Sequence, residues 1–143
     1  MDRSGADIPE QGARYSVREY LRLWLPTAVY IVLIMAMAVR PSPKLIAFRH
    51  LDKYLHGLAY GILAVLSYRS FAGAGSRRAA VFTLLLGFAV GMSDEGLQAL
   101  SRVRIADWRD LLADAIGTLI GTLIIARSLR RGRGPSSSRA PYL

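Results

Sequence analysis

The sequence predicts an all-α integral membrane protein, a bundle of four transmembrane helices with the N-terminus and the C-terminus both in the cytoplasm. Three observations lead to this prediction. Hydrophobic residues make up 52% of the 143 residues, and they form four blocks instead of recurring at a period of 2 or 3.6. The charged residues lie mostly between these blocks, and the formal net charge is +9. Each block approaches the ~20 residues that a helix needs to cross the hydrocarbon core.

The four apolar blocks define the predicted helices in order: residues 23–39, 54–71, 79–97 and 111–126. The first and fourth are short for a span, and Arg22 and Arg127 could extend them by snorkelling to the interface. Trp24 and Trp108 lie near block ends, where interfacial aromatic residues are common. The chain therefore divides into three parts: a polar cytoplasmic leader (1–20), a four-helix membrane domain (21–127) and a basic, disordered cytoplasmic tail (128–143).

The first block has a second interpretation, as a signal peptide. Basic residues, an apolar run and the sequence Ala36-Met37-Ala38 are together similar to a secretory signal with its cleavage site. The apolar run and the polar leader are both long for such a signal. A retained membrane anchor is therefore favoured.

The distribution of arginine and lysine gives the predicted orientation. The leader, the connection between the second and third blocks, and the tail, counted together with the adjoining Arg22, Arg69 and Arg127, hold twelve of the 19 basic residues, whereas the other two connections hold seven. By the positive-inside rule, both termini are cytoplasmic. The basic charge is typical of segments that face an anionic leaflet, and no basic helix interleaved with aromatic residues indicates a nucleic-acid partner. Because the chain has no cysteine, disulfides, thiolate catalysis and Cys-ligated metals are excluded.

Six of the ten acidic residues flank or interrupt the apolar blocks: Asp52, Asp94, Glu95, Asp107, Asp110 and Asp114. His56 and Asp114 each lie thirteen residues from a cytoplasmic arginine, which at 1.5 Å per residue places them ~20 Å from the inner edge. The same count places the other polar residues at similar or greater distances. Ionisable groups inside a bilayer are costly and usually mark a binding site, an ion path or a proton relay. The sequence therefore predicts a functional layer near the outer face.

On each of the last three predicted helices, polar residues three or four apart share one face: Asp52 with His56, Asp94 with Gln98, and Asp107 with Asp110 and Asp114. The fourth helix continues its stripe into Gly117 and Gly121, and the third helix has Gly87 and Gly91. Small residues at this spacing let helix backbones approach closely in lipid. These faces are therefore predicted to point into the bundle.

Three motifs in this order resemble the VanZ-like family. Asp52-Lys53-x-x-His56 is similar to the opening signature of that family, and residues 94–98 are similar to its Asp-Glu-x-x-Gln element. Arg104 with the segment 110–117 resembles its Arg-x5-Asp-x3-Asn/Asp-x2-Gly motif, although Asp114 stands where the family often has Asn. The resemblance covers residues 23–126 and implies a small multi-pass protein of the bacterial inner membrane. Some relatives are associated with resistance to the glycopeptide teicoplanin, and the family implies no established reaction.

The candidate site follows from these residues. The candidates for catalysis are His56, Asp94, Glu95, Asp110 and Asp114. The candidates for substrate binding are Asp52, Lys53, Gln98 and Arg104. A divalent cation is the one cofactor that the sequence suggests, because carboxylate oxygens are its preferred ligands, and the candidate ligands are Asp94, Glu95, Asp110 and Asp114.

Several functions remain open for this site. The favoured one is an envelope role through binding of an envelope lipid, a precursor or a lipophilic glycopeptide. An alternative is a membrane enzyme acting on an envelope lipid or precursor, with His56 as general acid or base. A further alternative is a proton- or cation-coupled transport element, for which the thin bundle would favour a homodimer. A purely structural network, with Arg104 paired to Asp110 or Asp94, is the competing interpretation. Asp52 could equally cap the second helix.

Overall fold

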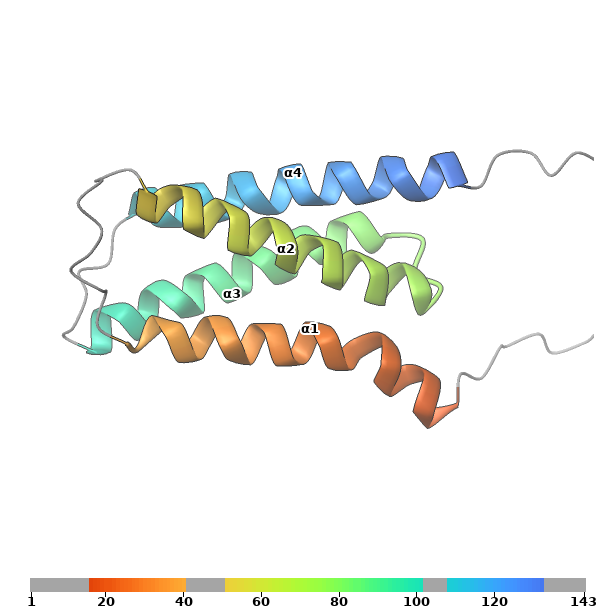
Figure 1. The fold of residues 1–143 in the computed structure, drawn as a ribbon, viewed down its shortest axis with the longest axis horizontal. Helices are drawn as coiled ribbons and strands as arrows, with labels where there is room; N and C mark the ends of the chain where they lie inside the picture. Colours follow the sequence, from red (N-terminus) through yellow and green to blue (C-terminus); the bar gives the residue numbers. More distant parts are fainter. Residues whose placement is uncertain (1–15, 41–50, 102–107, 133–143) are drawn as a thin grey trace, which may run out of the picture.

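The computed structural model describes residues 16–40, 51–101 and 108–132. The regular structure within these ranges is helical throughout: α1 (Val17–Ala38), α2 (Leu51–Gly73), α3 (Ala79–Ser101) and α4 (Trp108–Gly132). The helices lie side by side along one long axis (Figure 1). The start of α1, the α2–α3 turn and the end of α4 share one end of the bundle. The predicted all-α, four-helix architecture is confirmed.

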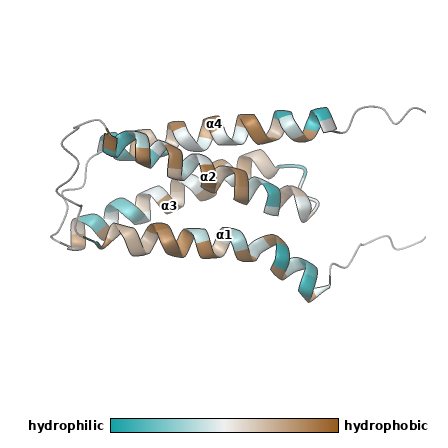
Figure 2. Ribbon diagram, viewed as in Figure 1, coloured by the Kyte–Doolittle hydropathy of each residue, from teal (hydrophilic) through white to brown (hydrophobic). Residues whose placement is uncertain are grey.

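Three of the four helices are long and apolar enough to cross a membrane: Val17–Ala38, Ala79–Leu100 and Trp108–Arg131. The chain is therefore a multi-pass membrane protein. Apolar residues fill the middle of the helices, and hydrophilic residues gather toward their ends (Figure 2). The remaining helix, α2, has 23 residues but is not among the three, and its sequence contains the charged residues Asp52, Lys53 and Arg69. The crossing of the membrane by α2 and the cytoplasmic placement of the termini stay predictions.

The first and last helices, α1 and α4, extend beyond the apolar blocks from which they were predicted. α1 begins at Val17, where Ser16 and Glu19 form a capping box: the Glu19 N–H donates to Ser16 Oγ, and the Ser16 N–H donates to Glu19 Oε2 at 2.8 Å. α4 begins at Trp108 and continues through the basic residues to Gly132. Apolar blocks mark only the lipid-facing length of a helix, and arginine is a good helix former beyond it.

A tight turn sets α2 and α3 antiparallel. The Ser76 N–H donates to the Phe71 carbonyl at 3.0 Å, and the Gly75 N–H donates to the Ala72 carbonyl at 3.1 Å. Gly75 has φ = 80°, so this is a Schellman motif with glycine in the left-handed region. Ser76 Oγ then accepts from the Arg78 N–H at 3.2 Å and caps the start of α3.

The closest helix packing is between α2 and α4, where glycine faces glycine. A methyl group added at Gly117 would clash with the carbonyl oxygen of Gly57, and one added at Gly121 would clash with the carbonyl oxygen of Gly61. The four-residue spacing on both helices repeats this contact over two successive turns. The predicted small-residue stripe on the fourth helix is therefore a packing surface, and its partner is α2.

α1 packs against α2 and α3. Near the α2–α3 turn, the hydroxyl oxygens of Thr27 and Ser70 lie 2.8 Å apart, and Ser70 Oγ donates to the Leu23 carbonyl at 2.7 Å. Farther along the bundle, the buried side chains of Ile34, Tyr60, Leu63 and Val90 form an apolar core between α1, α2 and α3. This core leaves the other face of α2 to α4.

We predict that Gly117→Ala lowers the free energy of unfolding by about 2 kcal/mol or more, because overpacking usually costs 1–3 kcal/mol and here the obstacle is backbone. Gly96→Ala is the matched control, since a methyl group at that helical glycine meets no atom within 4 Å. Thermal unfolding in mild detergent measures both variants. Equal unfolding temperatures for Gly117→Ala and the parent would contradict the glycine contact.

Candidate functional site

Polar side chains gather at the end of the bundle opposite the α2–α3 turn, where α2 and α4 begin and α3 ends. Four of them are at most 4% exposed: Asp94, Gln98, Asp110 and Asp114. Four more are half-buried: Asp52, Lys53, His56 and Glu95. The faces that the residue spacing selects are thus the faces that the bundle buries, on three different helices.

A histidine–aspartate contact links α2 to α4. His56 Nδ1 lies 2.9 Å from Asp114 Oδ1, and the exposed fractions of the two side chains are 10% and 2%. The other carboxylate oxygen, Asp114 Oδ2, is buried and has no hydrogen-bond partner within the described part of the chain. It faces α3 at Gly91, where an added methyl group would lie 3.5 Å from Asp114 Oδ2 and 3.6 Å from Tyr60 Cε1. The absence of a side chain at Gly91 leaves room beside this oxygen.

A second pair links the same two helices one turn nearer the end of the bundle. Lys53 Nζ donates to Asp110 Oδ1 at 2.8 Å. The predicted partner of Asp110 or Asp94 was Arg104, which lies outside the described residues. The residue spacing contains a hint of this contact: Lys53 lies three residues before His56, and Asp110 lies four residues before Asp114. Lys53 is therefore one helical turn from His56 on α2, and Asp110 is one turn from Asp114 on α4.

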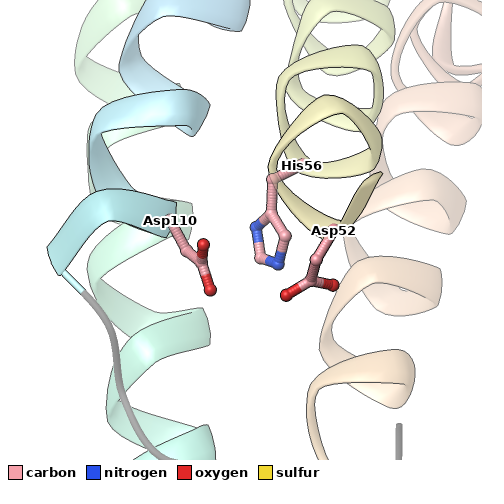
Figure 3. A group of neighbouring side chains, drawn as sticks. All are labelled: Asp52, His56 and Asp110. Carbon is pink, nitrogen blue, oxygen red and sulfur yellow. The ribbon is translucent and has the colours of Figure 1, made fainter. Parts of the chain in front are cut away.

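Among the described residues, two groups of side chains could hold a cation. One comprises Asp52, His56 and Asp110, whose side chains point toward one another between the first turns of α2 and α4 (Figure 3). The other comprises His56, Asp94 and Asp114. In each group one ligand atom per residue lies within 4.8 Å of the others. Oxygen ligands of calcium sit at 2.3–2.6 Å, so two ligands of one ion lie at most about 5 Å apart.

These groups differ in part from the predicted set of metal ligands. Asp52, which the sequence analysis assigned to substrate binding, belongs to one group, and Glu95 belongs to neither. Because His56 is common to both groups, they describe alternative ligand sets around one side chain. Asp52 is the second residue of α2, so it lies within the first turn and is not the N-cap residue itself.

The remaining candidates lie around this centre. Glu95 follows Asp94 on α3 and is half-buried, and Gln98, one turn farther along α3, is 1% exposed. A cavity of about 200 Å³ between α3 and α4 reaches Asp114 from the side of Gly87 and Thr118. The sequence analysis did not identify this cavity, because it depends on the relative rotation of two helices. Asp107, like Arg104, falls outside the described residues.

Comparison with known proteins identifies the family. The VanZ/LLP1 family profile matches residues 16–130, and the chain belongs to this family, as its three motifs predict. No curated protein and no solved structure matches the chain. The matched region contains α1, α2, α3, all but the last two residues of α4, and every candidate site residue.

We predict that Lys53→Met lowers the free energy of unfolding by about 1–3 kcal/mol, because the buried Asp110 carboxylate loses its ammonium partner. The loss is smaller than for a fully buried pair, since the Lys53 side chain is 30% exposed. Adding Asp110→Leu to Lys53→Met should recover most of the stability. Thermal unfolding of the four members of this double-mutant cycle measures the coupling, and strictly additive effects would contradict the pair.

Proposed function

We propose that this protein binds the polar head of a membrane amphiphile of the bacterial cell envelope at the His56–carboxylate site. The ligand classes are an envelope lipid, a lipid-linked precursor and a lipophilic glycopeptide. One observation carries the proposal: Asp114 Oδ2 is buried and lacks a hydrogen-bond partner within the described ranges. A network that served only to fix helix register would satisfy such an oxygen, because an unsatisfied buried acceptor is costly.

The energetic balance also favours a ligand. Interhelical hydrogen bonds in membranes contribute about 0.6 kcal/mol on average, whereas a carboxylate at mid-membrane costs at least ~2.5 kcal/mol, with a smaller cost nearer the interface. Asp94, Asp110 and Asp114 are each at most 4% exposed. Their hydrogen bonds to other helices return only part of the cost of burial. A cationic group supplied by a ligand would offset the remainder.

The proposed setting follows the charge distribution. With both termini in the cytoplasm and all four helices, α2 included, crossing the membrane, the site lies near the outer face of the inner membrane. In this position it meets lipids, precursors and glycopeptides of the outer leaflet. The family assignment supports this setting, since the resemblance includes relatives associated with teicoplanin resistance. Residues 1–20 and 128–143 are then the cytoplasmic leader and tail of the membrane domain 21–127.

A metal-dependent membrane enzyme is the second candidate, because two groups of side chains have cation-site geometry. Asp94 and Asp114, or Asp52 and Asp110, would hold a divalent ion through their carboxylates, and His56 would serve either as the third ligand or as the acid–base group. A histidine with a reference pKa near 6.5 is suited to general acid–base work on a bound lipid or precursor. The contact of His56 Nδ1 with Asp114 fixes the ring and leaves Nε2 as the nitrogen for proton transfer.

The binding proposal predicts that teicoplanin binds the parent protein in lipid nanodiscs and that His56→Gln and Asp114→Asn weaken binding about tenfold, since a hydrogen bond to a charged group is lost. Arg104→Ala should weaken it as well. Ser67→Ala is the control, because among the described residues its buried hydroxyl donates to carbonyls of its own helix. The teicoplanin resistance of bacteria that express the parent and each variant should follow the order of their binding affinities. Resistance lost without any change in binding would favour the enzyme instead.

The metal candidate predicts a rise in the unfolding temperature on adding Mg²⁺, Ca²⁺ or Zn²⁺, reversed by a chelator. At an ion concentration of ~100 Kd the stabilisation is about 2.7 kcal/mol. Asp94→Asn and Asp52→Asn test the two ligand sets separately. Glu95→Gln, which lies outside both groups, should keep the full response. Identical unfolding curves with metal and with chelator would rule against the metal site.

A further inference from the structure

The outer side of the α2–α4 contact carries a long apolar groove of about 680 Å³. Its floor consists of Gly57, Gly61, Gly117 and Gly121, because these residues have no side chain to fill the seam between the helices. Isoleucine and leucine side chains on both helices form its walls. Ligand pockets in proteins are commonly 300–1,000 Å³ in volume and mostly apolar with a few placed polar groups. The groove has these properties.

The length and lining of the groove suit a hydrocarbon chain. Its α2 side extends from Lys53 to Leu66, which is about 20 Å of helix at 1.5 Å per residue. Apart from Lys53 and Tyr54 at one end, its lining residues are apolar, so an extended acyl chain can lie along it.

One end of the groove joins the polar site. Lys53 lines the groove and also donates to Asp110 Oδ1 at 2.8 Å. Asp110 in turn belongs to the group with Asp52 and His56, whose side chains converge between α2 and α4 (Figure 3). An amphiphile with its chain in the groove therefore has its head group at this site. This continuity links the apolar groove to the cluster of charged side chains.

The charges at this end select the head group. Among the described side chains that are buried or half-buried there, five carboxylates accompany one lysine and one histidine: Asp52, Asp94, Glu95, Asp110, Asp114, Lys53 and His56. The acidic excess favours a cationic group with N–H donors. The ammonium of Lys53, at the junction with the groove, favours an anionic group on the chain side. A phosphate followed by a primary amine has these charges in this order.

We propose that the groove and the site together bind a phospholipid with a primary-amine head group, of the phosphatidylethanolamine class. One acyl chain lies between α2 and α4, the phosphate contacts Lys53, and the ammonium contacts the carboxylates of Asp52 and Asp110. This inference rests on the proposed function, since it assigns the ligand class of the same site. It adds a requirement for the apolar groove, and the two parts can be tested separately.

Native mass spectrometry of the purified full-length protein tests the inference with three lipids that carry identical oleoyl chains: phosphatidylethanolamine, phosphatidylcholine and phosphatidylglycerol. The first molecule of phosphatidylethanolamine should bind with a Kd about tenfold lower than that of either other lipid, because the choline head group donates no N–H bond and the glycerol head group has no amine. Ile120→Trp, which fills the groove, should abolish this preference. Leu119→Trp is the control, since Leu119 is 47% exposed, compared with 51% for Ile120, but lies outside the groove.

The outcomes separate the groove from the head-group site. Loss of the preference in both Ile120→Trp and a second groove variant, Ile62→Trp, with helical content kept by circular dichroism, supports the inference. Equal affinity for the three lipids overturns it, whether or not teicoplanin binds. A preference that survives both groove variants but is lost in Asp52→Asn overturns the groove alone and keeps the head-group site. Dimers that dissociate in Ile120→Trp would identify a second copy as the occupant and overturn the lipid assignment.

Discussion

The close approach of α2 and α4 through paired glycines is the constraint on which the rest of the structure depends. Because Gly117 meets the backbone of Gly57 and Gly121 meets that of Gly61, the two helices lie in one fixed register. That register places His56 beside Asp114 and Lys53 beside Asp110. The same contact creates the groove, whose floor is the glycine seam. A backbone contact that carries no charge thus sets the geometry of the charged site.

The electrostatics of the site follow from burial. Three helices bring carboxylates into a region where ionised groups are costly, and Lys53 and His56 each contact one carboxylate across the α2–α4 interface. These contacts orient the carboxylates, but among the buried and half-buried side chains of the site the carboxylates still outnumber the lysine and the histidine. An acidic site with fixed geometry is suited to a cationic partner, either the amine of an amphiphile or a divalent ion. Both proposed functions use this property.

The sequence predicted the helices, the family and the buried faces, because each depends on spacing within one helix. The aspartates and glycines of α4 recur at three and four residues, and that period alone places them on one face. Spacing also places Lys53 on the face of His56, but it could not show that Lys53 meets Asp110 or that a groove forms, since both depend on the rotation of α2 relative to α4. The sequence also placed the start of α1 and both ends of α4 too far inward, because apolar blocks end before the helical hydrogen bonding does.

The central claim is that the buried charge at this site serves a ligand and not the fold. The most direct measurement is the unfolding temperature, in mild detergent, of Asp114→Asn and Glu95→Gln beside the parent. Asparagine keeps an oxygen to contact His56 while removing a buried charge, and glutamine likewise keeps the shape of Glu95. We expect both variants to be as stable as the parent or more stable. A steep loss of stability in both would show that the charges hold the bundle together, and would contradict the claim.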